Sequence, residues 1–409
     1  MKKILINGGK ILSGQLKVSG SKNAALPMLL STLVISGESE IACVPKIGDT
    51  EVAINILSEF GVRAEWQGEK LKINTGEAHF AVPSEELVSK IRASTYLIGA
   101  SLARFGEARI LKYGGCDFAA RPIDLHIEAA KALGAKLSGD RLYAKRLVGG
   151  EINFPHPSVG ATVNALIMAA SAEGESVIRG FAREPHIMSL IDYLVSAGAD
   201  IKLSESEIRI TGRPLSKANG RVRPDMIEAG SYIATALLVG GDVTVSGVPS
   251  EELISFFSFL ESLGAVFSLA EDSVRVEGLN ASGMADITAA PYPAFPTDLQ
   301  PIAAPLMAAA NGGRIVDTVW PERFGYLDTL SRFGVVSERF FGGARIFPSE
   351  IRPASVIAPD LRGGFASVML SLFAEGESTV YSSDTVLRGY ERIEEKLRLI
   401  GADIKVLDS

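Results

Sequence analysis

The chain has 409 residues, a formal net charge of -7, and a composition that is 47% hydrophobic and 22% charged. This length is too great for one ordinary core, so two large domains are expected. The negative charge argues against a nucleic-acid partner, because such binding depends on a cationic surface. An anionic ligand must therefore be held by arginines and lysines gathered at one place.

The first residues predict a protein that is not exported. Residues 1–9 open with lysines but carry only three apolar residues before a glycine, which predicts a short strand rather than a signal peptide. Residues 24–36 are apolar yet too short to span a bilayer, and Pro27 lies among them, so we expect a core helix. The expectation is a cytoplasmic protein without a membrane partner.

The two cysteines, Cys43 and Cys116, indicate a reducing compartment rather than a disulfide framework. Cys43 lies in the apolar run 41–44, which predicts a buried strand residue. The cysteines and the four histidines show no metal-ligand spacing, so neither a metal nor another cofactor is expected.

One unit repeats six times along the chain. Each copy has a small-residue helix, a glycine, a β-branched strand, a loop, and an amphipathic helix that ends in a hydrophobic residue and glycine. The strand-opening glycines are Gly37, Gly106, Gly174, Gly241, Gly313 and Gly376. The helix-closing glycines are Gly61, Gly134, Gly198, Gly264, Gly334 and Gly401.

The two helices of a unit differ in their hydrophobic pattern. The second helix is amphipathic, as in 187–195, and a glycine follows it at the C-cap position. The first is apolar on nearly every side, as in 162–170, which is typical of a helix buried all round. This pattern predicts an α/β globule whose sheets cover a helical centre, and six units divide most simply into two domains of three.

Polar residues precede each buried helix. The six entries are 21–23, 92–94, 158–160, 225–228, 296–298 and 360–362. One polar residue there is explained as an N-cap, but Lys22, Arg92 and Arg362 place cations at the positive end of a helix dipole. A bound anion would relieve that conflict and accept hydrogen bonds from free backbone N–H groups. We therefore expect an anion site where helix starts converge between the domains.

A candidate reactive loop spans residues 113–122. Two glycines precede Cys116, and Arg121 follows five residues later. Glycines let a loop move, and a nearby cation favours the thiolate, so the pattern indicates a reactive cysteine. A surface loop with a chance cysteine is the alternative.

Four segments carry a resemblance that runs in register from the first strand to the C-terminus. They are 19–27, 114–126, 293–298 and 388–394. The sequence resembles the UDP-N-acetylglucosamine 1-carboxyvinyltransferase family and, more distantly, the shikimate-pathway enolpyruvyl transferase. The resemblance implies an inside-out α/β barrel in each of two domains, with three βαβαββ units apiece. It also implies that residues 1–20 join 222–409 in the second domain and leave 21–221 as the first.

The resemblance also implies the chemistry. The enolpyruvyl group of phosphoenolpyruvate would pass to the 3'-hydroxyl of UDP-N-acetylglucosamine through a tetrahedral phospho-ketal, with release of phosphate. This is the first committed step of peptidoglycan synthesis, a cytoplasmic step of cell-wall formation. The reaction needs an acid for carbon, a base for the hydroxyl, and cations for phosphate and carboxylate. A monomer is consistent with it, and no partner beyond the two small substrates is expected.

Residue roles follow from the same resemblance. Cys116 would be the general acid and the thiol that fosfomycin alkylates, and Asp298 would be the base. The phosphate-binding cations would be Lys22, Arg121 and Arg388, and those for the carboxylate Arg323 and Arg362. Arg92 would align the loop, and Asn23 and Asp360 would bind the sugar or orient neighbours. The nucleotide contacts would be Arg121, Pro122, Ile123, Asp124, Leu125, Ser158, Val159 and Gly160.

Two of these neighbourhoods have simpler explanations beside the functional ones. Asp298 taken alone could be an N-cap carboxylate, although its place in a matching segment favours catalysis. His126, one turn beyond Arg121, could be a structural imidazole or a functional one.

The sequence also departs from the family pattern. Tyr113, Asp117, Phe118 and Ala119 replace the usual loop residues, and Gly48, His156 and His186 stand where lysine or glutamate is usual. The acidic neighbour of Cys116 should raise the thiol pKa. These changes leave open a paralogue that uses another uridine acceptor, such as UMP. A catalytically idle binding module is a third alternative, which the retained cations disfavour.

Overall fold

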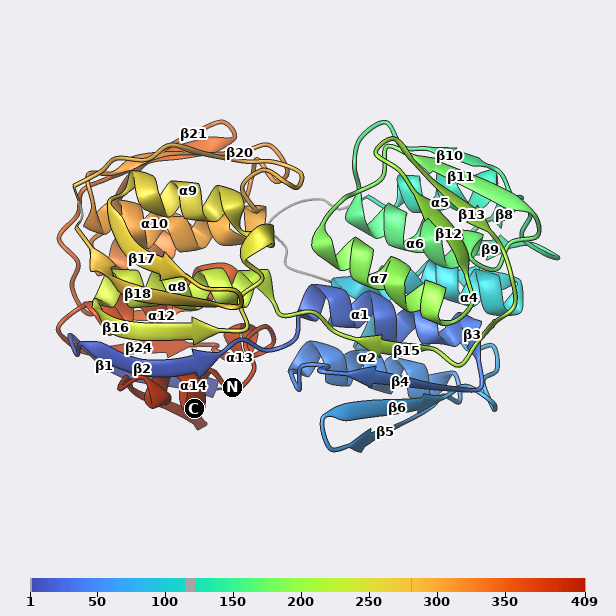
Figure 1. Ribbon diagram of the computed structural model, residues 1–409, viewed down its shortest axis with the longest axis horizontal. Coiled ribbons are helices and arrows are strands. Elements are labelled where there is room, and N and C mark those ends of the chain that lie inside the picture. Colours follow the sequence, from blue (N-terminus) through green and yellow to red (C-terminus); the bar gives the residue numbers. More distant parts are fainter. Residues whose placement is uncertain (1, 115–121, 281, 409) are drawn as a thin grey trace. The chain divides into compact units, whose positions relative to one another are not determined.

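Figure 1 shows the computed structural model, which describes residues 2–114, 122–280 and 282–408. The chain forms two compact units. Unit 1 consists of residues 1–19 and 224–409, and unit 2 of residues 20–223. The sequence pattern and the resemblance place the boundaries at 20/21 and 221/222. No helix within the described part of the chain is long and apolar enough to cross a membrane.

Unit 2 contains three copies of the repeat. Its helices are α1 (Lys22–Ser31), α2 (Gly48–Glu59), α3 (Glu85–Val88), α4 (Leu97–Phe105), α5 (Asp124–Ala132), α6 (Val159–Ala169) and α7 (Pro185–Ser196), with 3-10 turns η1 (Thr32–Val34) and η2 (Arg92–Tyr96). Its strands are β3 (Ile35–Ser36), β4 (Glu38–Ala42), β5 (Arg63–Gln67), β6 (Lys70–Asn74), β7 (Glu107–Arg109), β8 (Lys136–Ser138), β9 (Arg141–Tyr143), β10 (Glu151–Asn153), β11 (Glu175–Arg179), β12 (Asp200–Leu203), β13 (Glu207–Thr211), β14 (Leu215–Ser216) and β15 (Asn219–Arg221).

Unit 1 contains the other three copies. Its helices are α8 (Met226–Val239), α9 (Ile254–Ser262), α10 (Gln300–Ala309), α11 (Tyr326–Leu330), α12 (Leu361–Phe373), α13 (Asp384–Leu387) and α14 (Ile393–Leu399), with 3-10 turns η3 (Ser250–Glu252), η4 (Thr297–Leu299) and η5 (Ser331–Phe333). Its strands are β1 (Lys2–Gly8), β2 (Leu12–Lys17), β16 (Gly241–Ser246), β17 (Ala265–Leu269), β18 (Ser273–Leu279), β19 (Ile287–Ala289), β20 (Gly313–Asp317), β21 (Val336–Phe340), β22 (Gly343–Phe347), β23 (Ser355–Ile357), β24 (Gly376–Tyr381) and β25 (Asp403–Asp408).

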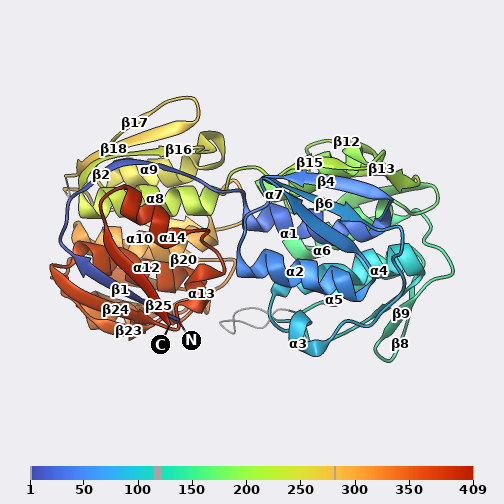
Figure 2. The same ribbon diagram turned by 90° about the horizontal axis from the view of Figure 1, so that it is seen from below.

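Six small sheets correspond to the six repeats, and β14 and β3 form a further two-stranded sheet in unit 2. The strand orders are β15-β4-β6-β5, β7-β9-β8 and β10-β11-β13-β12 in unit 2, and β17-β18-β16-β2, β19-β20-β22-β21 and β23-β24-β1-β25 in unit 1. In unit 1 the N-terminal strand β1 lies between β24 and the C-terminal strand β25 and pairs antiparallel with both. Both chain ends therefore lie at one sheet of unit 1 (Figure 2).

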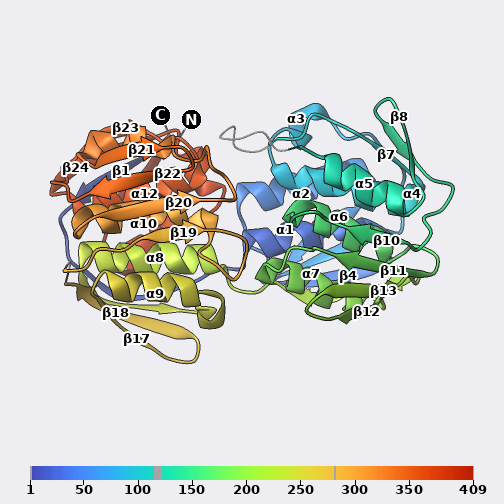
Figure 3. The same cartoon turned by 90° about the horizontal axis from the view of Figure 1, so that it is seen from above.

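The first helices of the repeats form the core of each unit. In unit 1, α8, α10 and α12 pack against one another, and Figure 3 shows them stacked between the outer sheets. Almost every residue of α12 and α8 is buried, as expected for helices without a polar face. The predicted α/β fold of βαβαββ repeats with helices inside and sheets outside is confirmed.

The helix-closing glycines explain the regular chain reversals. Gly61 and Gly198, for example, have φ of 78° and 104°, a left-handed conformation that costs glycine little. All six glycines predicted to close a second helix have positive φ, so each amphipathic helix stops at the same kind of signal.

One local expectation differs in its bounds, and another was wrong. The helix expected over 24–36 begins at Lys22 and ends at Ser31, after which the chain forms η1 and β3. Cys43 is only partly buried and lies in a bend after β4, with φ of 58°. The bend brings the Cys43 carbonyl against Gly20, where an added Cβ would lie 1.9 Å from its oxygen. A close approach between distant residues therefore ends the strand one residue before Cys43.

Candidate active site

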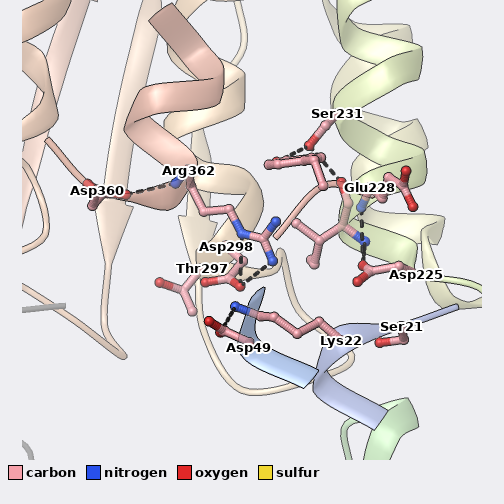
Figure 4. Close-up of polar contacts among 12 residues, drawn as sticks. Ser21, Lys22, Asp49, Asp225, Glu228, Ser231, Thr297, Asp298, Asp360 and Arg362 are labelled. Carbon is pink, nitrogen blue, oxygen red and sulfur yellow. Dashed lines mark hydrogen bonds and ion pairs between the residues drawn. The ribbon is translucent and has the colours of Figure 1, made fainter. Parts of the chain in front are cut away.

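Asp298 lies between two buried arginines in unit 1. Its Oδ1 accepts a hydrogen bond from Arg323 Nη1 at 2.7 Å, and its Oδ2 accepts from Arg362 Nη2 at 3.1 Å. The arginine side chains are 6% and 2% exposed, whereas that of Asp298 is 29% exposed. One carboxylate thus faces two desolvated guanidinium groups and is the member that solvent reaches. Figure 4 shows its contact with Arg362.

Helix starts place these groups. Asp298 belongs to η4, directly before α10, and its carboxylate bonds to the guanidinium groups described above. Arg362 lies in the first turn of α12, where Asp360 is the N-cap and accepts from the backbone N–H of Arg362 and Gly363 at 2.9 and 3.0 Å. Asp225 caps α8 in the same way. Two carboxylates of the expected helix entries, Asp225 and Asp360, are therefore N-caps.

Aromatic packing supports the Arg362 guanidinium. Its carbon lies 5.3 Å from the ring centroid of Tyr390, and that ring stacks on Phe365 at 4.2 Å. The Tyr390 hydroxyl hydrogen-bonds Ser231 at 2.8 Å. Because Phe365 and Ser231 hold the Tyr390 ring in place, that ring stabilises the positive charge of the guanidinium group and fixes its plane. Tyr390 follows the predicted cation Arg388, which is partly buried at the end of α13.

Nearby groups of unit 1 hold Arg362 in its charged form. Burial alone would lower the pKa of Arg362, but Tyr390 and the carboxylates of Asp298 and Asp225 outweigh it and hold that pKa above its ordinary value. Arg362 Nη1 is buried and has no hydrogen-bond partner among the described residues. A buried donor without a partner is costly, and an anion would satisfy it.

Unit 2 places Lys22 at the start of α1. Lys22 Nζ lies 3.3 Å from Asp49 Oδ2, and the two side chains are 14% and 5% exposed. Lys22 opens α1, whose N-cap is Ser21, while Asp49 lies in the first turn of α2 directly after Gly48. Asn23 follows Lys22 in the first turn of α1 and is also partly buried. The ion pair makes this end of α1 nearly neutral.

The two predicted nucleotide segments are adjacent within unit 2. Residues 122–125 lead into α5, and Ser158 caps α6, where its hydroxyl accepts from Ala161 N–H. Asn164 of α6 lies 2.7 Å, Nδ2 to Nδ1, from His126 of α5. Gly160 faces the same ring, since an added Cβ would lie 2.8 Å from His126 Cε1. The His126–Asn164 contact therefore joins the two segments.

His126 is a neutral, buried imidazole. Burial lowers its pKa to about 4, and the charge of Arg92 acts in the same direction. The Asn164 amide donates, because its oxygen already accepts from Gly99 N–H, so Nδ1 accepts and Nε2 carries the proton. This geometry favours the structural interpretation of His126. Arg92 itself is partly buried at the start of η2.

Cys116 and Arg121 lie outside the described residues, as do Asp117, Phe118 and Ala119. Before that gap, the Tyr113 hydroxyl donates to the Arg109 carbonyl at 3.0 Å. Gly114 N–H donates to Val88, and a Cβ at Gly114 would lie 1.7 Å from the Ser89 carbonyl oxygen. The first glycine of the loop is thus required by a close backbone approach. No group of acids, histidines and cysteines in the described ranges could hold a metal ion.

Several residues of these sites were not found from the sequence. Asp49, Asp317, Thr297, Tyr390 and Asn164 all bond or pack against predicted residues. Tyr390 and Thr297 had a local signal, because each lies inside a segment that matches the family. The others come from elements distant in sequence, so pairing could not be read from spacing.

The described sites, one in each unit, combine buried cations, a shared carboxylate and helix starts, as expected of an enzyme that handles small anions. A family model described as EPSP synthase (3-phosphoshikimate 1-carboxyvinyltransferase) matches residues 6–397. The chain therefore belongs to this family of enolpyruvyl transferases. It is an enzyme that transfers the enolpyruvyl group of phosphoenolpyruvate to an acceptor.

Curated relatives match over nearly the whole chain. A UDP-N-acetylglucosamine 1-carboxyvinyltransferase of Halothermothrix orenii is 40% identical and covers 99% of each chain. One from Streptococcus agalactiae is 37% identical over 100% of both. Among solved structures, the enolpyruvyl transferase NikO of Streptomyces tendae has a TM-score of 0.90 at 25% identity, covering 100% of this chain and 99% of that one. EPSP synthase of Acinetobacter baumannii, at 17% identity and a TM-score of 0.74 with both chains fully covered, shares the fold.

Proposed function

We propose that the acceptor is UDP-N-acetylglucosamine and that its 3'-hydroxyl receives the enolpyruvyl group. The observation that carries this proposal is the Asp298 carboxylate bound by two buried guanidinium groups. Full-length relatives at 40% and 37% identity bear the name of this activity. The step would begin peptidoglycan synthesis, and it is a cytoplasmic reaction of two small substrates.

In this proposal Asp298 is the base of the first step. The carboxylate of phosphoenolpyruvate binds Arg323 and Arg362 and takes over hydrogen bonds that Asp298 now accepts. An oxygen of Asp298 is then available for the acceptor hydroxyl, which loses its proton as its oxygen bonds to C2. Because Asp298 is 29% exposed beside nearly inaccessible arginines, it is the member of the cluster that a hydroxyl can reach.

The other residues protonate C3 and bind the phosphate that leaves. Cys116 delivers a proton to C3 as the acceptor oxygen adds to C2, giving the tetrahedral phospho-ketal. Lys22, Arg121 and Arg388 stabilise the phosphate, which leaves with its electron pair as the C3 proton is removed and the double bond returns. Asn23, Arg92 and Asp360 orient the sugar or its neighbours.

The nucleotide would bind along the two adjacent segments of unit 2. Ser158, Val159 and Gly160 offer N–H groups at the start of α6, which suits a diphosphate. Pro122, Ile123, Asp124 and Leu125 would contact the uridine together with Arg121.

A second candidate acceptor is another uridine nucleotide, such as UMP. Two departures from the family pattern favour it: His156, which is exposed before α6, and His186, the second residue of α7. The structure with 25% identity and a TM-score of 0.90 is that of the enolpyruvyl transferase NikO, whose name differs from that of the curated relatives.

Phosphate release with phosphoenolpyruvate and a panel of acceptors tests both. The panel contains UDP-N-acetylglucosamine, UMP and shikimate 3-phosphate, and mass spectrometry of the acceptor confirms transfer. Activity with UDP-N-acetylglucosamine supports the proposal. Activity with UMP alone supports the second candidate, and silence across the panel refutes both.

A further inference from the structure

Asp317, at the end of β20, is a buried carboxylate to which the proposed mechanism gives no role. It is 1% exposed and accepts three hydrogen bonds. Its Oδ1 accepts from the backbone N–H of Val319 and Trp320 at 2.9 and 2.8 Å. Its Oδ2 accepts from the Thr297 hydroxyl at 2.6 Å. A buried charge kept at this cost needs a reason beyond stability, since such groups add little net stability.

The partners of Asp317 lie on the two segments that carry the site. Val319 and Trp320 begin the loop that leads to Arg323, whose backbone N–H donates to the Trp320 carbonyl at 3.0 Å. Thr297 is the residue before Asp298 in η4. One oxygen of Asp317 thus holds the arginine loop, and the other holds the turn that carries the carboxylate.

The circuit closes through Arg323. Its Nη1 donates to the Thr297 carbonyl at 3.2 Å and to Asp298 Oδ1 at 2.7 Å. The ring of contacts therefore runs from Asp317 to the loop, to Arg323, to Asp298 and Thr297, and back to Asp317. Such a ring leaves neither side free to turn without breaking a bond to a buried group.

We infer that Asp317 is a positioning residue that fixes Asp298 and Arg323 relative to each other. It touches neither substrate and acts through Thr297 and the loop. The inference rests on the proposed role of Asp298 as base, because the purpose of the ring is to hold that carboxylate where it meets the acceptor hydroxyl.

Asp317→Asn is the sharpest variant. The amide oxygen still accepts from the backbone N–H groups of Val319 and Trp320, so the loop keeps these two hydrogen bonds. The amide nitrogen cannot accept, so the bond that the Thr297 hydroxyl donates to a carboxylate is lost, and only a weaker neutral bond with the amide as donor can replace it. We expect kcat to fall about tenfold, the equivalent of one buried hydrogen bond, while the acceptor KM stays within about twofold. Thr297→Val removes the same bond from the other side and should have the same effect.

The double variant tests whether the two residues act through one bond. If they do, Asp317→Asn with Thr297→Val is no slower than either single variant. Asp286→Asn is the matched control, because Asp286 is exposed and accepts from Arg314 N–H at 2.7 Å near the start of the same strand. Its kcat should equal that of the parent enzyme. Circular dichroism confirms that each variant is folded.

The outcomes separate this inference from the proposed function. A parent enzyme that is active, with Asp317→Asn turning over within twofold of it, overturns the inference and leaves the function standing. Losses that multiply in the double variant also overturn it. A parent enzyme silent with every acceptor refutes the proposed function and the inference with it. If Asp317→Asn does not fold, Thr297→Val decides alone, and an unchanged kcat there is the contrary result.

Discussion

The two units hold their cations in different ways. In unit 2, Lys22 pairs with Asp49 at 3.3 Å, one cation with one buried acid. In unit 1, Arg323 and Arg362 share the single carboxylate of Asp298. In the first arrangement one acid serves one cation, whereas in the second one carboxylate serves two guanidinium groups. Asp49 keeps a lysine in place, whereas an incoming anion can displace Asp298 from its arginines.

Replacing each acid by its amide should separate these roles most strongly. Asp298→Asn removes the proposed base, so kcat should fall by about a thousandfold with little change in acceptor KM. Asp49→Asn only loosens Lys22 and should lower kcat by less than about tenfold. Steady-state kinetics with both substrates varied measures the split. A large loss of acceptor affinity with normal turnover in Asp298→Asn would contradict its role.

The proposed acid should matter somewhat less than the base. Cys116→Ser keeps the shape of the thiol but donates a proton less readily, so kcat should fall by about a hundredfold. Time-dependent inactivation by fosfomycin should be lost altogether. Inactivation that proceeds at the parent rate would place the reactive thiol elsewhere, with Cys43 the other candidate.

Exchanging arginine and lysine tests whether the planar guanidinium group of Arg362 and the ammonium group of Lys22 act differently. Arg362→Lys keeps the charge but loses the planar fork and its stacking on Tyr390, so the KM for phosphoenolpyruvate should rise about tenfold. Lys22→Arg should disturb substrate binding less, because its ion pair with Asp49 is a point contact. Steady-state kinetics with phosphoenolpyruvate varied provides the measurement. Equal effects of the two swaps would argue against separate roles.

The smallest effect concerns stability and pH in unit 2. The pKa of His126 is lowered to about 4, below the ordinary value of 6.5, so the unfolded chain binds this proton more readily. Stability from His126 is therefore complete above pH 6.5 and is lost as pH falls toward 4, by up to about 3 kcal/mol. Urea unfolding at several pH values measures the loss. His126→Gln should flatten that dependence, and an unchanged slope would show that other groups cause it.

Much of the fold could be predicted because its signals are local. A helix-closing glycine such as Gly198 and the apolar run of α6 each mark their element without knowledge of any neighbour. The prediction of a buried strand residue at Cys43 was wrong because the conformation of Cys43 depends on Gly20, which approaches it from another segment.

The residues of the candidate site likewise divide into those with a local sequence signal and those without one. Arg362 and Asp298 stand in recognisable segments, and the structure brings them together. Asp317 and Asp49 showed no signal, because an acid at a strand or helix end is ordinary until its distant partner is known. Sequence reasoning found the groups proposed to meet substrate and missed those that hold them.

The position of β1 has a consequence for the order in which the protein matures. This strand is made before unit 2, yet both of its neighbours, β24 and β25, are made after it. Unit 2, by contrast, is a continuous stretch that can fold while synthesis proceeds. Strand β1 must therefore wait with its backbone unpaired, as exposed as any sheet edge, until β24 and β25 have been synthesised.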